Sequence, residues 1–360
     1  MIATPTTESP PRVLTRVRGV LKPSMLGQLA ALPAIVIAVL VGSQLNRAFL
    51  TVDNIMTNVL AASAVLGVLT VAAALIIIAG HFDMSTQSVV AFAPVLSVWL
   101  VMPAAAGGSG VELDPVLGLL LIFVLGAVVG AINGFLVAGL KLNAFIVTLA
   151  MLILLQGMTL GIGGGETLSN LPEVFTYLGS ARWLGIPAEV VVAVAVFVAA
   201  GLFMRYTVTG RQIYAIGGNP DAARASGIRV ERITFWLFVA SGVLAALAGL
   251  LMTARIASVT ASQGNNILFT VFAAAVIGGI DLRGGRGRIV GVATGVLLLA
   301  LVQNILLVSQ IPSFWVNAIY GAIILLALMT GALAQGSWLT RFRRSPHAPQ
   351  PAPDRSGDDR

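Results

Sequence analysis

Cysteine is missing from this sequence, and charge is scarce. The 360 residues include no cysteine, two histidines and only 10% charged residues, whereas a soluble domain averages about a quarter charged. The lack of cysteine excludes disulfides, thiolate catalysis and sulfur-ligated metals. The two histidines, His81 and His347, lie in different kinds of segment and do not indicate a metal site. We therefore predict no catalytic residues and no metal ligands.

The sequence also lacks a nucleotide-hydrolysing site of its own. A phosphate-binding loop needs the pattern G-x-x-x-x-G-K-[ST], in which the lysine reaches the phosphates. The chain has two lysines, Lys22 and Lys141, and neither stands in that pattern. The glycine cluster "LRGGRGR" at 282–288 is better interpreted as a turn that leads into the next apolar run. Energy for uphill transport would therefore have to come from a partner.

Long apolar runs dominate what is present. Hydrophobic residues make up 58% of the chain, and several runs reach the ~20 residues that a helix needs to cross the hydrocarbon core. This pattern predicts an all-α polytopic membrane protein with about ten transmembrane helices, whose surroundings are a lipid bilayer. The runs lie at 30–41, 59–79, 89–101, 116–140, 145–162, 190–203, 233–252, 269–277, 289–308 and 316–333.

The formal charge of +7 is explained by topology, so no nucleic-acid partner is expected. With ten spans and a cytoplasmic N-terminus, all but three of the 21 basic residues fall in cytoplasmic segments, as the positive-inside rule requires. The exceptions are Arg47, Arg182 and Arg255. We predict that both termini are cytoplasmic. The predicted organisation is a disordered cytoplasmic arm at 1–25, a transmembrane domain at 26–335 with a cytoplasmic loop at 205–232, and a disordered cytoplasmic tail at 336–360.

Ionisable groups are nearly missing from the predicted spans. A charged group at the bilayer centre costs roughly 3 kcal/mol or more, so proton- or ion-coupled carriers keep such groups for function. Asp83, in "AGHFDMSTQS", is the one candidate, and this scarcity argues against a proton-driven carrier. Neutral polar side chains could form interhelical hydrogen bonds, or as a set they could line a seam for an uncharged, hydroxyl-rich solute. The candidate translocation path consists of Asp83, Ser85, Ser88, Asn133, Asn143, Thr148, Gln303 and Asn304.

Glycine recurs every fourth residue in three stretches. On a helix each set lines one face and lets a neighbouring backbone approach closely, which predicts a tightly packed bundle. The sets are Gly126, Gly130 and Gly134; Gly157, Gly161 and Gly165; and Gly287, Gly291 and Gly295.

A short internal echo, that is, a weak sequence repeat, relates "IIAGHFDMS" (77–85) to "VIGGIDLRG" (276–284). Such pairs can mark broken helices near a transport pathway, and a match this short also arises by chance.

The segment "GGNPDAARASGI" (217–228) is a hydrophilic interruption between two apolar runs. Asn219 can accept a hydrogen bond from the free amides of a helix start, and Pro220 suits the first helical position. Gly227 is the expected left-handed stop. The segment therefore predicts a helix of about two turns, which is too short to be stable alone in water. It should be ordered by packing on its own membrane domain or on another protein.

The residues of this segment resemble those of a known family. "DAARASG" (221–227) has the spacing E/D-A-A-x-x-x-G of the cytoplasmic coupling loop in permease subunits of ATP-binding cassette importers. The resemblance covers roughly residues 55 to 333 and is closest to ribose-type sugar permeases. The similar stretches are "TGRQIYAIGGNPDAARASGI" (209–228), "GHFDMSTQS", "GAINGFLVAGLKLNAFIVTLAM" (130–151) and "VIGGIDLRGGRGRIVGVATGVLLLALVQN" (276–304).

The resemblance implies partners that the chain itself does not contain. They are a second permease copy or homologue, a cytoplasmic ATPase that binds ATP and magnesium, and an external solute-binding protein. No cofactor is expected in this chain. The resemblance also implies that Asp221, Ala222, Ala223 and Gly227 belong to the helix that docks on the ATPase. The full set of ATPase-coupling residues is Gly217, Gly218, Asn219, Asp221, Ala222, Ala223, Arg224 and Gly227.

The leading interpretation is the permease subunit of such an importer in a bacterial inner membrane. It would translocate a monosaccharide or a related polyhydroxylated solute into the cytoplasm by alternating access. The family's usual "GGIDLSVGS" is here "GHFDMSTQS", and a proline common after Lys141 is here Asn143, which leaves the exact sugar open. The alternative is a self-sufficient secondary carrier or channel for a small neutral solute. A membrane enzyme is the third, for which no catalytic set is found.

Overall fold

The computed structural model describes residues 31–311, 315, 318–319, 321–322 and 325. The chain divides into two compact units, Met1–Ser309 and Gln310–Arg360, and the account below concerns the described residues of the first. The predicted arm at 1–25 and tail at 336–360 lie outside the described residues, and so does most of the apolar run at 316–333.

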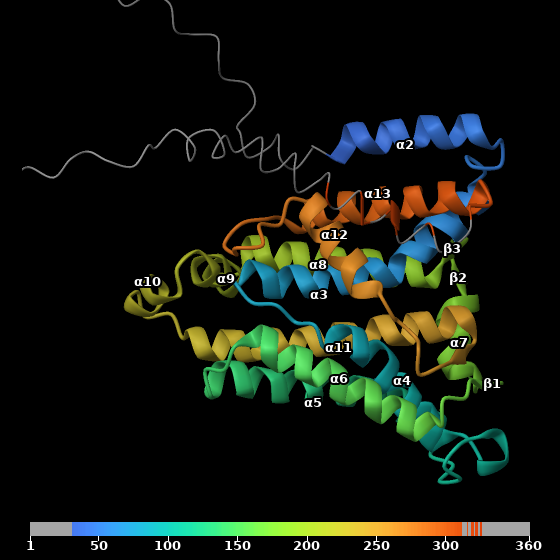
Figure 1. Ribbon diagram of the computed structural model, residues 1–360, viewed down its shortest axis with the longest axis horizontal. Coiled ribbons are helices and arrows are strands. Elements are labelled where there is room, and N and C mark those ends of the chain that lie inside the picture. Colours follow the sequence, from blue (N-terminus) through green and yellow to red (C-terminus); the bar gives the residue numbers. More distant parts are fainter. Residues whose placement is uncertain (1–30, 312–314, 316–317, 320, 323–324, 326–360) are drawn as a thin grey trace, which may run out of the picture. The chain divides into compact units, whose positions relative to one another are not determined.

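Helices make up most of this unit (Figure 1). They are α2 (Ala31–Leu45), η1 (Asn54–Ala61), α3 (Ala62–Ile78), α4 (Thr86–Val101), η2 (Ala104–Ala106), α5 (Pro115–Gly134), η3 (Phe135–Gly139), α6 (Ala144–Gly163), α7 (Glu173–Ser180), α8 (Ala188–Tyr206), α9 (Val208–Gly218), α10 (Pro220–Ala225), α11 (Val230–Ile256), α12 (Ile267–Ile277) and α13 (Ile289–Val308). Two antiparallel pairs of two-residue strands join β1 (Leu168–Ser169) to β4 (Ser258–Val259) and β2 (Arg182–Trp183) to β3 (Ile186–Pro187).

The lengths of these helices confirm an all-α polytopic membrane fold. Within the described residues, six helical segments are long and apolar enough to cross a membrane, and three shorter apolar helices accompany them. The long segments are 54–78, 115–139, 144–163, 188–206, 230–256 and 289–308, and the shorter helices are 32–45, 86–101 and 267–277. Nine of the ten predicted apolar runs thus coincide with helices in the described part of the chain.

Two of the shorter helices, α4 and α12, begin inside the bundle. Residues 79–85 leave the end of α3 and pass back between the helices before α4 starts at Thr86 (Figure 1). Residues 257–266 lead from the end of α11 to the start of α12, and within them Gln263 is 5% exposed. The two helix starts are neighbours, because the amide of Leu268 donates to Oε1 of Gln87 at 3.4 Å. We refer to α4 and α12 as the half-helices.

Glycine faces bring pairs of helices into backbone contact. A methyl group added at Gly126 would overlap the carbonyl oxygen of Gly242, so α5 and α11 touch backbone to backbone. The same holds for Gly291 and Gly278, which join α13 to the end of α12. The first predicted stripe is confirmed, and so are Gly291 and Gly295 of the second, whereas Gly287 lies in the loop before α13. The third stripe has no such contact in the described part of the chain, since a methyl group at Gly157, or at the other two glycines of that stripe, would meet no described atom within 4 Å.

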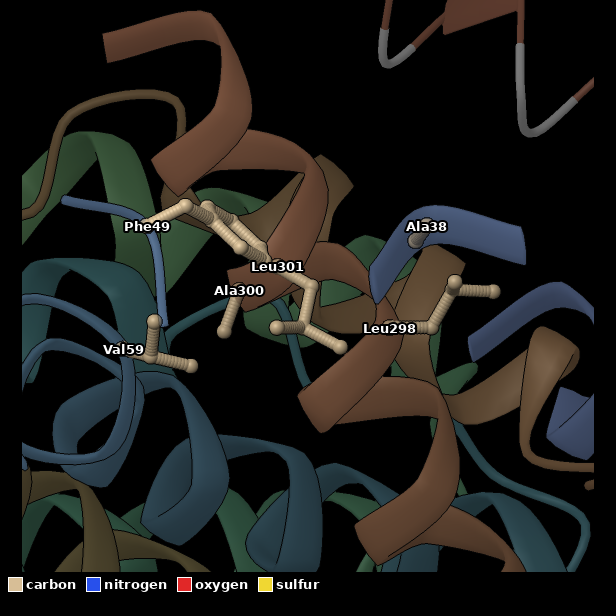
Figure 2. Close-up of a cluster of buried hydrophobic side chains, with 6 residues drawn as sticks. All are labelled: Ala38, Phe49, Val59, Leu298, Ala300 and Leu301. Carbon is tan, nitrogen blue, oxygen red and sulfur yellow. The ribbon is translucent and has the colours of Figure 1, made fainter. Parts of the chain in front are cut away.

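A hydrophobic cluster holds α2 against α13 (Figure 2). Phe49, in the turn after α2, is 0% exposed and packs with Val59, Leu298 and Leu301. A methyl group at Gly42 would lie 2.5 Å from the Phe49 ring, so the ring covers α2 at this glycine. Helix α3 lies at the centre of the unit. In the segment 54–78, which ends with α3, 94% of the most apolar stretch is buried.

Candidate functional site

The hydrophilic segment forms a short capped helix, α10, at one end of the bundle (Figure 1). Oδ1 of Asn219 accepts hydrogen bonds from the amides of Asp221 and Ala222, both at 3.0 Å. Pro220 occupies the first turn, and Gly227 has a φ of +81°. The predicted cap, proline start and left-handed glycine stop are therefore confirmed, and the helix itself ends at Ala225.

Helix α10 is ordered by its own domain. Ala223 is 4% exposed and packs with Ile216 of α9 and Val230 of α11 in a small hydrophobic cluster. Arg224 closes the other side with a 2.8 Å bond to Asp221 and a 2.9 Å bond to Glu231. The bond to Glu231 raises the pKa of Arg224. The structure thus turns Ala223 inward and leaves Asp221, Ala222 and Ala225 exposed, so the exposed side is the one available to a partner.

Four glycines from three segments meet next to α10. Gly80 follows α3, and Gly217 lies in the last turn of α9. Gly284 and Gly285 belong to the loop after α12. A methyl group at Gly217 would overlap the carbonyl oxygen of Ile78, and one at Gly284 would lie 2.8 Å from the Cα of Gly80. The amide of Gly285 donates a 2.8 Å hydrogen bond to that carbonyl of Ile78. We call these four glycines the glycine junction, in which three backbones touch without side chains between them.

A tyrosine supports the glycine junction. The hydroxyl of Tyr214, in α9, donates a 2.9 Å hydrogen bond to the carbonyl oxygen of Gly287. Burial raises the pKa of Tyr214, while the positive charge of Arg288 acts in the opposite direction. The phenol therefore remains protonated and able to donate at neutral pH. This bond ties α9 to the loop between α12 and α13.

A buried polar cluster lies further inside the bundle, where residues 79–85 pass between helices. Oδ1 of Asp83 accepts from the backbone amide of Ser85 at 3.1 Å and from its hydroxyl at 2.6 Å. Oδ2 accepts from the hydroxyl of Ser241, in α11, at 2.8 Å. Asn133, in α5, donates to Oγ of Ser85 at 2.8 Å. We call Asp83, Ser85, Asn133 and Ser241 the Asp83 cluster.

The Asp83 cluster is closed to solvent in this structure. Asp83 is 3% exposed and Asn133 is 0% exposed. Burial of a carboxyl group is costly unless its oxygens receive hydrogen bonds, and here three donors supply them. The cluster therefore fastens the non-helical segment 79–85 to α5 and α11. Asp281, the other aspartate of the internal echo, lies in the turn after α12 and accepts from the amide of Arg283 at 3.0 Å, so the two aspartates do not share an environment.

Comparison with known proteins identifies the family. A family model described as "Branched-chain amino acid transport system / permease component" matches residues 55–328. The chain belongs to this family. The permease is therefore a multi-pass membrane protein and the non-catalytic component of its transport system.

Several relatives of the permease are named for sugars. The ribose import permease protein RbsC of Escherichia coli is 33% identical over 303 residues, which cover 83% of the permease and 92% of that protein. The protein of the same name in Bacillus subtilis is 34% identical over 295 residues, covering 81% and 89%. The L-arabinose transport system permease protein AraH of Escherichia coli is 34% identical over 250 residues, covering 69% and 74%. No solved structure gave a significant match.

The remaining candidate path residues of the permease do not join the Asp83 cluster. Ser88 donates to the carbonyl oxygen of Leu152 in α6 at 2.8 Å, and Thr148 donates to the carbonyl oxygen of Ala144 at 2.8 Å. Asn143 is exposed and caps α6. The last two candidates, Gln303 and Asn304, lie on α13, remote in sequence from the Asp83 cluster. Gln303 is exposed, whereas Asn304 is buried and exchanges hydrogen bonds with Asn54 at 2.9 and 3.0 Å.

Gln263 is a buried residue of the permease that sequence reasoning missed. Its amide nitrogen donates to the carbonyl oxygens of Val90 at 3.2 Å and Gly249 at 3.1 Å, and to Oγ1 of Thr253 at 3.0 Å. Val90 needs this donor because Pro94, four residues later in α4, has no N–H to offer. Gln263 therefore links α11, α4 and the segment before α12. A proline inside an apolar run was the available signal, since it leaves a carbonyl that must find another donor.

The titratable groups of the permease do not gather into a metal site in the part of the chain that the structure describes. No group of three or more His, Asp or Glu side chains there is arranged to hold a metal ion. At the end of the bundle opposite α10, Arg255 lies 3.9 Å from Glu189, and Arg182 lies 3.9 Å from Asp53. These acidic and basic groups are paired with one another rather than with a ligand.

Proposed function

We propose that this permease is the membrane-spanning subunit of an ATP-driven importer that moves a monosaccharide or a related polyhydroxylated solute into the cytoplasm by alternating access. Membership of a family of permease components supports the transport role. Relatives named for ribose and L-arabinose, each at least 33% identical, support a sugar over the branched-chain amino acid of the family's description.

The proposed location of this permease is the inner membrane of a bacterial cell. In the proposed topology it crosses that membrane about ten times, and both termini are cytoplasmic. Its support is the distribution of charge. Residues 205–232 and the loop 278–288 carry the basic residues of the α9–α10 end, whereas the opposite end carries acidic residues such as Glu112, Asp114 and Glu173. Positive charge favours the cytoplasmic side. The half-helices α4 and α12 are counted as spans in this topology. Each is preceded by a non-helical segment inside the bundle, and the segment and the half-helix together cross the membrane.

In this proposal a cytoplasmic ATPase binds the exposed side of α10, and ATP and magnesium are held by that partner. A second permease copy or homologue completes the transport path, and an external binding protein delivers the solute. The eight residues that the sequence predicted to couple the permease to the ATPase then have different roles. Asp221 and Ala222 are exposed for contact, Asn219 and Gly227 shape the helix ends, and Ala223 anchors it.

The glycine junction is the observation that carries the coupling proposal. It joins the end of α9, directly before α10, to the start of 79–85 and to the loop after α12. A force on α10 is therefore passed to the segment that precedes α4 and to the loop that follows α12. In many transporters, interrupted helices near the membrane centre form the solute site around which the rest of the protein rocks.

Ala222→Arg tests the docking surface. The added side chain points away from the small cluster under α10, so the permease should fold normally and lose its ATPase during co-purification. Ala223→Arg is unsuitable because Ala223 is buried. Ala105→Arg is the matched control, since Ala105 is also exposed and lies in η2, beyond the end of α4 that points away from α10. Equal ATPase recovery with Ala222→Arg and Ala105→Arg would contradict the proposed docking surface.

The solute is tested with the reconstituted importer and its binding protein. Ribose, L-arabinose, a polyol and branched-chain amino acids are added singly, and ATP hydrolysis is measured. Stimulation by a sugar or polyol is expected, and stimulation by amino acids alone would reject the sugar proposal. Uptake by the permease alone, without ATPase, would instead favour the self-sufficient carrier or channel.

A further inference from the structure

A groove of about 950 Å³ runs along the permease between α8 and α11. Both helices pack on α3, and Leu75 of α3 forms part of the groove floor. The walls contain the small side chains Ala199 and Ala200 of α8 and Ala240 of α11, which leave space that larger residues would fill. The groove belongs neither to the Asp83 cluster nor to the exposed side of α10.

The groove is polar at one end only. Arg229 and Arg232, at the start of α11, line that end together with Thr209 and Gln212 of α9. Beyond them the lining is apolar, and Val196 and Leu244 mark the far end. Trp236, at the rim, is 58% exposed, as expected for an indole ring in the headgroup region.

The two arginines carry uncompensated charge. Both are exposed, and neither guanidinium group forms an ion pair or a hydrogen bond with another described residue. The acidic residue between them in sequence, Glu231, is already bonded to Arg224 at 2.9 Å. The end of the groove is therefore a cationic site with room for an anionic group.

The length of the groove matches one leaflet of a bilayer. Fifteen residues of helix separate Arg229 from Leu244, which is about 22 Å at 1.5 Å per residue. Half of the hydrocarbon core is about 15 Å thick, and the headgroup layer adds several more. A ligand with an anionic head and a long apolar tail would match both the charge and the length. A soluble anion would leave the apolar part empty, and a sugar would find few hydrogen-bonding partners there.

We propose that the groove binds one anionic glycerophospholipid, with its phosphate between Arg229 and Arg232 and an acyl chain along the alanines of α8 and α11. The orientation given under Proposed function places this lipid in the cytoplasmic leaflet. Because Gly227 also lines the groove, the lipid lies directly behind the end of α10. The lipid thus fixes the position of α9 and α11 on either side of the coupling helix.

The test uses the full-length permease purified with its ATPase. Retention of dioleoyl phosphatidylglycerol is compared with that of dioleoyl phosphatidylcholine by native mass spectrometry, and thermal unfolding is followed with each lipid added. The acyl chains are identical, so only the headgroup differs, anionic in phosphatidylglycerol and zwitterionic in phosphatidylcholine. We expect preferential retention of, and stabilisation by, phosphatidylglycerol. Equal effects of the two lipids would overturn the proposal.

Three variants locate the site. Each basic residue near a membrane surface contributes about 1 kcal/mol to binding of anionic lipid, so Arg229→Gln or Arg232→Gln should weaken phosphatidylglycerol binding about fivefold and the double variant about thirtyfold. Arg283→Gln, at the same end but outside the groove, should have no comparable effect. Equal losses with Arg283→Gln would indicate a diffuse charge effect and overturn the site.

Two further variants test the position of the acyl chain and the alternative that a second permease copy, rather than a lipid, covers the groove. Ala240→Phe fills the groove and should reduce lipid retention while leaving the arginines in place; unchanged retention would overturn the acyl-chain position. Ala240→Cys introduces the chain's one cysteine, and disulfide-linked permease dimers would show that a second copy covers the groove. Recovery of the ATPase is measured in parallel, so a failed lipid site is distinguishable from a failed docking proposal.

Discussion

Alanine at position 217 is expected to destabilise the permease, whereas alanine at position 218 is not. Both residues are in the last turn of α9 and differ in what faces them. A methyl group at Gly217 would overlap the carbonyl oxygen of Ile78 and lie 2.5 Å from the amide nitrogen of Gly285, whereas one at Gly218 meets no described atom within 4 Å. The neighbours of Gly217 are backbone atoms, which cannot rotate away.

Three contributions determine the size of the effect. Overpacking costs about 1–3 kcal/mol in free energy of unfolding. Separation of α9 from α3 would also strain the 2.8 Å hydrogen bond between Gly285 and Ile78, which is worth about 1 kcal/mol. The higher helix propensity of alanine returns at most about 1 kcal/mol. Gly217→Ala should therefore lose about 1–3 kcal/mol net, and Gly218→Ala should be neutral or slightly stabilising.

The assay is thermal unfolding of the full-length permease in detergent, followed by solute-stimulated ATP hydrolysis of the reconstituted importer. Gly217→Ala should unfold at a lower temperature than Gly218→Ala, and its ATP hydrolysis should respond less to solute. Wild-type values of both quantities for Gly217→Ala would refute the reasoning, because they would show that the three backbones are not in tight contact.

Three other changes test the buried polar contacts, all by thermal unfolding. Gln263→Leu should cost about 2–3 kcal/mol because the buried acceptors that share its two N–H groups, above all the carbonyl oxygen of Val90, lose their donor. Pro94→Ala restores a helix N–H, so the double variant should lose less than the sum, and strict additivity would contradict the link. Ser241→Ala should cost about 1 kcal/mol without changing which solute stimulates the importer, and a changed solute preference would instead place the Asp83 cluster on the path. Asn54→Leu and Asn304→Leu should each cost about 1–3 kcal/mol, and the double variant less than their sum, because neither amide of this pair is then left without its partner. A double variant that loses the full sum would count against the pair.

The sequence was informative where local chemistry decides structure. Asn219, Pro220 and Gly227 predicted the ends of α10 because caps and left-handed stops depend on neighbouring residues alone. The apolar runs predicted the helices for the same reason. Glycine spacing predicted close contacts, but not which stripe would be used: Gly126 has a partner in α11, whereas Gly157 has none in the described part of this chain.

Contacts between distant segments could not be predicted in this way. Polar residues in the spans looked alike in the sequence, yet Asn133 bonds to Ser85 while Asn304 pairs with Asn54 and Asn143 merely caps a helix. Ser241 is one serine in a long apolar helix, and nothing nearby in the sequence marks it as a donor to the buried carboxylate. These roles depend on helix positions, which local patterns do not supply.

A backbone-to-backbone contact such as the glycine junction has no side-chain rotamers with which to absorb a displacement. The segment after Gly80 leads into α4, and the loop holding Gly284 follows α12, so one movement of α9 is shared between both half-helices. Their starts also touch each other through Gln87 and Leu268. The two half-helices are consequently linked both through the glycine junction and through the contact between their starts. Displacing one half-helix without the other would have to break one of these contacts.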